Sequence, residues 1–273
     1  PNLRRLVDVW LRQLGVEMDR RGPAFEDFVR TEIARQIASS RLVSVSKCMG
    51  QSFKFRPRGV REEEIDVVLV VGTRVLLGEA KCSVFPTESK QYAMHRHLVI
   101  EATQQIKRKC DAVEARRDEF RVQLRDRGLE VPEDFKVVPA VILNFAVHCC
   151  TSVDAVPVID LHVLETFFAG ELIDFAEMDS DRGLEAMAKR VFYADVDEAV
   201  DRLESFMLSP PQMEVFRRGL SERWVPIPAI SDGDWPAVYL KVECQPVPDQ
   251  AVLELLRGQQ DNASGGLDVV GAA

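Results

Sequence analysis

The stretch that decides the fold is IDVVLVVGTRVLLGEAK, residues 65–81, in which two apolar runs flank a short Gly-Thr-Arg sequence. Runs rich in valine and leucine with a glycine turn between them are typical of two antiparallel strands. Both runs are too apolar to be exposed edge strands. We therefore expect a buried strand pair here.

Three charged residues interrupt this apolar pair, namely Asp66 near its start and Glu79 and Lys81 near its end. If the loop has two residues, Asp66 lies opposite Glu79, whereas a three-residue loop places it opposite Ala80. Because strand side chains alternate between the two faces, Glu79 and Lys81 share one side. In either register, two carboxylates and one ammonium converge on one spot.

Two neighbouring carboxylates resist joint ionisation unless a positive charge lies between them, which predicts a bound divalent cation. Mg²⁺ prefers oxygen ligands and commonly combines one or two carboxylates with waters and a substrate phosphate, and Mn²⁺ is the alternative. Lys81 is then placed to orient or deprotonate an attacking water and to offset charge on the phosphate. The simpler alternative is that Glu79 and Lys81 form an ordinary solvated ion pair.

A second acidic feature lies in GPAFEDFVRTEIARQIASS, residues 22–40. Its apolar residues recur at helical spacing, and the early proline suits a first helical turn. Glu26 lies at the border of the apolar stripe, from where we expect it to point toward the strand pair. The alternative is that Glu26 and Asp27 only complement the helix N-terminus.

The combination of G-x-x-F-E on a first helix, an Asp at the start of a strand and Glu-x-Lys on the next strand resembles the PD-(D/E)XK nuclease superfamily. Within it, the chain is most similar to the restriction endonuclease-like group of methyl-DNA-directed restriction enzymes and the nuclease-related domain. The resemblance covers residues 20–172. Ile65 stands where the motif's proline would be.

The resemblance implies a role for each matching residue. Glu26 would be the first-helix carboxylate, Asp66 and Glu79 the metal ligands, and Lys81 the catalytic lysine. Ala80 would contribute its backbone carbonyl to the metal. These are expectations for a Mg²⁺- or Mn²⁺-dependent site.

The family often places a glutamine on the helix after the Glu-x-Lys strand, and this chain offers EATQQIKRKCDAV, residues 101–113. We favour Gln105 as the residue that touches the site, although two surface glutamines, Gln104 and Gln105, remain the alternative. The same helix carries Lys107, Arg108 and Lys109, which are either phosphate contacts or a solvated face.

A basic segment leads into the Asp66 strand, with phenylalanines interleaved among its cations. We expect it to form a lip that contacts the nucleic-acid backbone, the alternative being a basic surface hairpin. The contacts assigned to this lip are Lys47, Lys54, Arg56 and Arg58.

The rest of the chain completes an α/β pattern. FKVVPAVILNFAVHCC reads as a central strand, and AVPVIDLHVLETFF as a strand that passes into a short helix through Asp160 and ends at Gly170. This order predicts a three-layer sandwich around a mixed sheet, of restriction endonuclease-like type, with a smaller C-terminal α+β accessory region.

Four segments follow from this reading: an N-terminal helix or linker at 1–19, the nuclease domain at 20–172, the accessory region at 173–258 and a disordered tail at 259–273. Within the accessory region, residues 184–207 show helical spacing, and a short β element is expected around 238–242.

Composition limits the function classes. The 273 residues carry a net charge of −9, which argues against a protein that coats nucleic acid nonspecifically but does not exclude a nuclease. No apolar run reaches membrane-spanning length, so no membrane partner is expected. Six cysteines without framework spacing indicate reduced thiols and a cytoplasmic setting.

The sequence thus predicts a metal-dependent nuclease acting on nucleic acid, with DNA as the favoured substrate and a restriction or anti-phage defence role. The alternatives are a DNA-repair nuclease and a catalytically silent nuclease-fold module that binds a protein. Two kinds of partner remain possible, a second copy of the chain in a homodimer or another protein bound by the C-terminal region.

Overall fold

The computed structural model describes Trp10 and residues 13–15, 21–59, 61–179, 183–214, 220–227 and 237–244. The chain forms two compact units. One comprises residues 1–172 and 192–210, and the other comprises residues 173–191 and 211–273.

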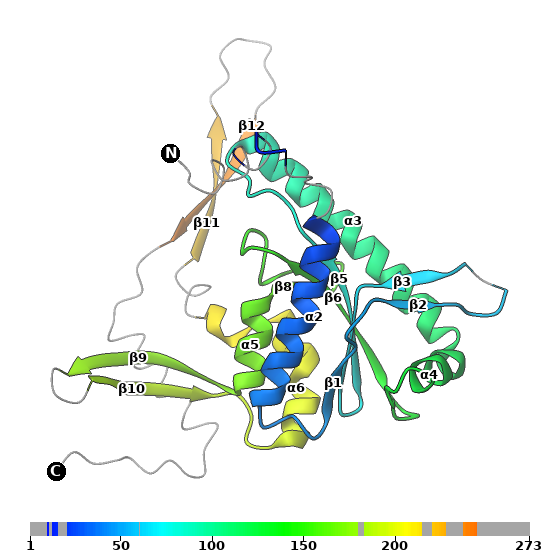
Figure 1. The fold of residues 1–273 in the computed structure, drawn as a ribbon. Helices are drawn as coiled ribbons and strands as arrows, with labels where there is room; N and C mark the ends of the chain where they lie inside the picture. Colours follow the sequence, from blue (N-terminus) through cyan, green and yellow to red (C-terminus); the bar gives the residue numbers. More distant parts are fainter. Residues whose placement is uncertain are drawn as a thin grey trace. The chain divides into compact units, whose positions relative to one another are not determined.

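The first unit is built on a mixed six-stranded sheet in the order β1-β4-β5-β6-β8-β7 (Figure 1). The central strands β5, β6 and β8 run parallel, while β1, β4 and β7 pair antiparallel with their neighbours. The strands are β1 (Ser46–Cys48), β4 (Val67–Val71), β5 (Arg74–Lys81), β6 (Lys136–Leu143), β7 (Thr151–Val153) and β8 (Val156–Asp160).

Helices cover both faces of this sheet, which gives three layers. On one face lie α2 and α5, with α6 beside them, and on the other lie α3 and α4 with the small hairpin of β2 and β3 (Figure 1). The helices are α2 (Arg21–Ser39), α3 (Ser89–Glu114), α4 (Arg117–Arg125), α5 (Leu161–Ala169) and α6 (Val196–Leu208), and the hairpin strands are β2 (Phe53–Phe55) and β3 (Glu63–Ile65).

Each strand of the central pair feeds two separate apolar cores because its side chains alternate. Leu69 packs in the core beneath α2 and α5, whereas Val68 and Val70 pack in the core beneath α3 and α4. All five residues of β4 are buried. The prediction of a buried strand pair is therefore confirmed.

The turn between β4 and β5 has two residues, which settles the register. Val71 pairs with Arg74 and Val67 with Gly78, so that Asp66, just before β4, lies level with Glu79. Gly72 takes a φ of +55°, and its N–H donates to the carbonyl of Val45 at 2.8 Å. A two-residue hairpin loop commonly needs such a left-handed residue, and glycine adopts it without strain.

The predicted central strand and the strand-to-helix passage are both confirmed, as β6 and as β8 followed by α5. Asp160 caps α5, because its Oδ1 accepts a 3.2 Å hydrogen bond from Val163 N. Gly170 ends the helix with a φ of 74°.

The region after 172 differs from the prediction in two ways. The expected helix over 184–207 is instead strand β10 (Gly183–Val191) followed by α6. Moreover, α6 belongs to the first unit and not to an accessory region, because Ala199, Leu203 and Phe206 form an apolar stripe that packs in the core beneath α2 and α5.

In the second unit, β9 (Glu171–Asp179) pairs with β10, and β11 (Leu220–Ile227) pairs with β12 (Ala237–Cys244), next to a short 3-10 turn at Pro211–Met213. The β element expected around 238–242 is thus confirmed. Apart from Trp10 and residues 13–15, the predicted N-terminal segment 1–19 lies outside the described residues, as does the tail 259–273. No described helix is both long and apolar enough to cross a bilayer.

Candidate functional site

A cluster of buried charges lies where β4 begins and β5 ends. Glu79 is two residues beyond Leu77, and Asp66 is two residues before Val68, so both carboxylates lie on the sheet face that packs against α3. Lys81 follows on the same face of β5. The sheet therefore brings together the three charged residues predicted from the sequence.

Two hydrogen bonds fix Asp66 in place. The N–H of Ala80 donates to its carboxylate Oδ2 at 2.9 Å, across the strand pair. From α2, Nη1 of Arg30 donates to the Asp66 backbone carbonyl at 2.6 Å. The remaining carboxylate oxygen, Oδ1, is directed toward α3.

Helix α3 contributes a lysine that the sequence reasoning had assigned only to a basic cluster. The ammonium of Lys109 bonds Glu79 Oε2 and lies 3.8 Å from Asp66 Oδ1. Lys81 Nζ donates to the other oxygen of Glu79, Oε1, at 2.6 Å. The site is therefore a balanced set of two carboxylates and two ammoniums.

The four side chains differ in their access to solvent. The side chains of Glu79, Lys109 and Asp66 are only 5%, 8% and 12% exposed, whereas that of Lys81 is 26% exposed. Lys81 is consequently the member best placed to meet a ligand arriving from solvent.

Burial, and after it the negative charge of Glu79, raises the pKa of Asp66 from 3.8 to about 6. Lys109 and the Ala80 N–H act in the opposite direction. A second cation placed between Asp66 and Glu79 would favour the ionised form of Asp66.

Glu26 lies at the margin of this cluster. Its side chain is 26% exposed, and its Oε2 is 4.0 Å from Arg30 Nη1. Burial raises the pKa of Glu26, Arg30 lowers it, and the charges of Glu64 and Glu79 raise it. Glu26 therefore lies within electrostatic reach of Glu79, but among the described residues no hydrogen bond joins it to Asp66 or Glu79.

Gln105, the predicted glutamine, is partly buried on α3, one turn before Lys109. Within the described part of the chain, it makes no hydrogen bond to the carboxylates, and Lys109 is the α3 residue that does. A cue to Lys109 is present in the sequence, because it lies on the same buried stripe of α3 as Ala102, Ile106 and Val113.

The three consecutive basic residues of α3 each contact a different partner. Arg108 forms a two-pronged hydrogen bond with Glu63 of β3, at 3.0 and 3.1 Å. Lys107 lies 3.7 Å from Asp154. With Lys109 in the carboxylate cluster, these three cations do not form a common phosphate-binding face.

Acidic residues lie beside three residues of the predicted basic lip, and one of these three forms an ion pair. Lys54 lies opposite Glu64 in the β2–β3 register, and Arg56 forms an ion pair with Glu62. The backbone N–H of Arg58 donates to Glu119 Oε2 at 2.8 Å.

The phenylalanines of this lip point inward. Phe53 and Phe55 are fully buried and pack edge-on against Phe120, with ring centroids 5.5 and 5.4 Å apart. They therefore belong to the core and do not offer stacking surfaces to bases.

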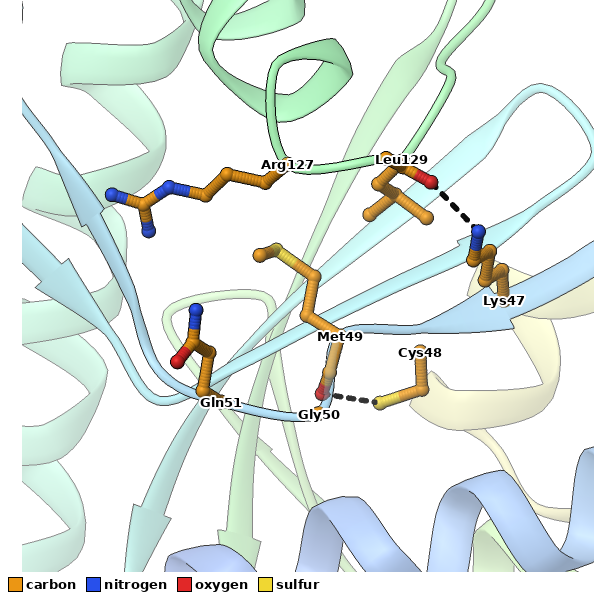
Figure 2. Close-up of a pocket in the computed structure, with 8 residues that line it drawn as sticks. Lys47, Cys48, Met49, Gly50, Gln51, Arg127 and Leu129 are labelled. Atoms are coloured by element: carbon orange, nitrogen blue, oxygen red, sulfur yellow. Dashed lines mark hydrogen bonds between the residues drawn. The ribbon is translucent and has the colours of Figure 1, made fainter.

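Lys47 lies beside a different hollow, a cavity of about 360 Å³ between β1 and the turn after α4 (Figure 2). Its Nζ donates to the carbonyl of Gly128 at 2.7 Å. Arg127 borders the same cavity and lies over the ring of Phe53 at 4.9 Å. Lys47 thus donates a hydrogen bond to a carbonyl just beyond the C-terminal end of α4.

A histidine pair at the ends of β6 and α3 was not expected. His95 is buried, and its Nδ1 lies 2.8 Å from Nδ1 of His148, with the two rings stacked at 13°. Burial lowers the pKa of both residues. His95 lies on the buried face of α3.

The donor set of the cluster fits a hard divalent cation. Asp66 Oδ1 and Glu79 Oε2 both face the ammonium of Lys109, which shows that this position accepts a positive charge. Carboxylate oxygens suit Mg²⁺ and Mn²⁺ when waters complete the shell. Among the described residues, no group of three or more His, Cys, Asp or Glu side chains is arranged to bind a metal.

Comparisons of the chain with protein-family models, with curated proteins and with solved structures found no match.

Proposed function

We propose that this protein is a nuclease of restriction endonuclease-like fold that hydrolyses phosphodiester bonds of DNA with Mg²⁺ or Mn²⁺. One observation carries the proposal. Asp66, Glu79 and Lys81 gather on one face of two adjacent strands, with both carboxylates buried and the lysine reaching toward solvent. This arrangement supports metal-assisted phosphodiester hydrolysis, in which carboxylates would hold the metal and a cation would offset charge on the phosphate.

Each side chain has a role in this proposal. Asp66 and Glu79 would hold the cation through Oδ1 and Oε2, with the Ala80 carbonyl as a further ligand. A bound cation would supply Lewis-acid stabilisation of the phosphate charge and help to ionise the attacking water. Lys81 would orient that water and offset charge on the phosphate, and Glu26 would hydrogen-bond water at the margin.

Substrate binding is proposed for the basic residues of the lip and for Gln105. Lys54 and Arg56 are exposed on the β2–β3 hairpin, although Glu64 and Glu62 lie beside them. Phosphates would have to compete with these acids, so we expect affinity that depends strongly on salt. Gln105 is close to Lys109 along α3 and would contact the substrate or a water.

The test is cleavage of supercoiled plasmid, linear duplex, single-stranded DNA and RNA in Mg²⁺ or Mn²⁺, by the parent chain, Lys81→Ala and Asp66→Ala. We expect the parent to cut DNA and both variants to lose at least about a hundredfold in rate. Matched controls are Lys136→Ala and Asp134→Ala, which remove exposed charges outside the cluster. They should cut as the parent does.

Cleavage of RNA alone would support the proposed nuclease activity but show that the substrate is RNA and not DNA. Cleavage that survives both Lys81→Ala and Asp66→Ala would place the activity elsewhere or in a contaminant. A parent that cuts none of the substrates with either metal would contradict the proposal.

The charge pairing of the cluster favours one other candidate, a catalytically silent module that binds a protein. Both oxygens of Glu79 already accept hydrogen bonds from lysines, so the site is neutral without a metal. In that case, the charges would serve stability alone. Calorimetry with Mn²⁺ and DNA together separates the two, because a silent module would bind neither of them.

The role in restriction or anti-phage defence follows from the resemblance to that family, with DNA repair as the alternative. A single site cuts one strand at a time. Cleavage of both strands, seen as linear product from plasmid, would therefore indicate a second copy of the chain or a protein partner. Sedimentation analysis with DNA would detect a second copy.

A further inference from the structure

Lys109 is the member of the charge cluster to which the proposed reaction gives no role. Its side chain is 8% exposed, and its ammonium contacts the two carboxylates that would hold the cation. A buried ammonium without an anionic partner is strongly disfavoured. The position of Lys109 is therefore fixed by Asp66 and Glu79.

A divalent cation and the ammonium of Lys109 cannot share these oxygens. Both would have to lie between Asp66 Oδ1 and Glu79 Oε2, and two positive charges a few ångströms apart repel each other. Lys81 does not conflict in the same way, since it bonds the opposite oxygen of Glu79, Oε1. Lys109 must consequently move whenever the site binds a metal.

When Lys109 moves, it needs another anion. Glu63, an acid that α3 already contacts, receives two hydrogen bonds from Arg108. A phosphate of the substrate is the anion that the proposed function brings to this site. A lysine ammonium on its flexible four-carbon stem is well suited to such an exchange of partners.

We infer that Lys109 couples metal binding to nucleic-acid binding: its ammonium occupies the cation position in the free protein and transfers to a substrate phosphate when DNA arrives. This inference rests on the proposed nuclease function. It makes the free protein a weak binder of divalent cations. By linkage, DNA strengthens metal binding, and metal strengthens DNA binding by the same factor.

The experiment measures Mn²⁺ affinity by calorimetry for the parent, Lys109→Met and Lys107→Met, first without nucleic acid. Lys109→Met keeps the apolar stem and removes the charge, and we expect it to bind Mn²⁺ at least about tenfold more tightly than the parent. Lys107→Met removes an exposed charge on the same helix, and it should match the parent. Lys109→Arg, which keeps the charge, should remain weak.

The second step repeats the titrations with a phosphorothioate duplex that resists cleavage. The duplex should raise the Mn²⁺ affinity of the parent by a factor about ten times larger than that for Lys109→Met. If Lys109→Met does not fold, as judged by circular dichroism, Lys109→Gln serves the same comparison.

The two hypotheses fail in different ways. A parent that cuts DNA while Lys109→Met binds Mn²⁺ no more tightly than the parent would overturn the coupling and leave the nuclease intact. If the parent neither cuts nor binds DNA, this result would contradict both the proposed function and the coupling that rests on it.

Discussion

Nη1 of Arg30 donates a 2.6 Å hydrogen bond to the backbone carbonyl of Asp66. The guanidinium comes from α2, which packs on one face of the sheet, while the Asp66 carboxylate is directed to the other face, where Lys109 lies. Arg30 is itself buried and paired with Asp27. The first helix therefore holds the backbone of the site, and its packing sets where the carboxylate can point.

We predict that Asp66 makes stability depend on pH between about 4 and 6. Its pKa is about 6 in the folded protein, against 3.8 ordinarily, because burial disfavours the charge. Between these values, the unfolded chain has lost the proton and the folded protein retains it, so the free energy of unfolding falls as pH rises and levels off above about 6. Cleavage, which needs ionised Asp66, should rise over the same range.

Urea unfolding of the parent and of Asp66→Asn at several pH values checks this expectation. The variant cannot ionise, so its stability relative to the parent should increase with pH, by on the order of 2 kcal/mol in total. A difference that stays constant from pH 4 to about 7.5 would show that Asp66 is ionised throughout.

We predict that Gly72→Ala destabilises the first unit by about 2 to 3 kcal/mol. An added Cβ would lie 2.6 Å from Val200 Cγ2, at a residue whose φ is +55°. The matched control is Gly128→Ala, with a φ of +78° and no atom within 4 Å of the added Cβ. It should lose only about 1 kcal/mol, and equal losses in urea unfolding would mean that Val200 moves aside.

We predict that Glu63→Gln loosens the β2–β3 hairpin. Glu63 is buried and receives both hydrogen bonds from Arg108, so removing its charge should cost about 1 to 2 kcal/mol. Hydrogen exchange of the hairpin amides should accelerate. Asp154→Asn, which breaks the exposed contact with Lys107, should change stability by less than about 0.5 kcal/mol.

We predict that Lys54→Ala weakens DNA binding chiefly through its salt dependence. If the Lys54 ammonium contacts one phosphate, the slope of log affinity against log salt should decrease by about one. Fluorescence anisotropy with a labelled duplex at several salt concentrations measures this slope. A slope identical to that of the parent and of Lys136→Ala would show that Lys54 contacts no phosphate.

The strand pair and its three charges could be predicted because they are local. Residues 65–81 contain both strands and their turn, so a short sequence determines which side chains meet. The same holds for Asp160 and Gly170, which cap a helix with their own side chain and backbone. In these places, sequence pattern and structure agree because few distant contacts intervene.

Lys109 and Arg30 could not be predicted in the same way. Lys109 meets Glu79 across 30 residues and Arg30 meets Asp66 across 36, and the packing of helices on the sheet decides these meetings. The strand at Gly183–Val191 was missed for a related reason. Its residues are largely good helix formers, and pairing with β9 overrides that preference.

The N–H of Phe192 donates to the carbonyl of Gly170 at 2.9 Å, so the chain returns to the first unit beside the point at which it left. The hairpin of β9 and β10 is therefore an insertion whose two ends are joined by this hydrogen bond. The β9–β10 hairpin can therefore change in length, since a longer or shorter hairpin leaves the contacts of Gly170 and Phe192 unchanged. Relatives of this protein could therefore differ widely between these two residues while keeping the same sheet and the same charged cluster.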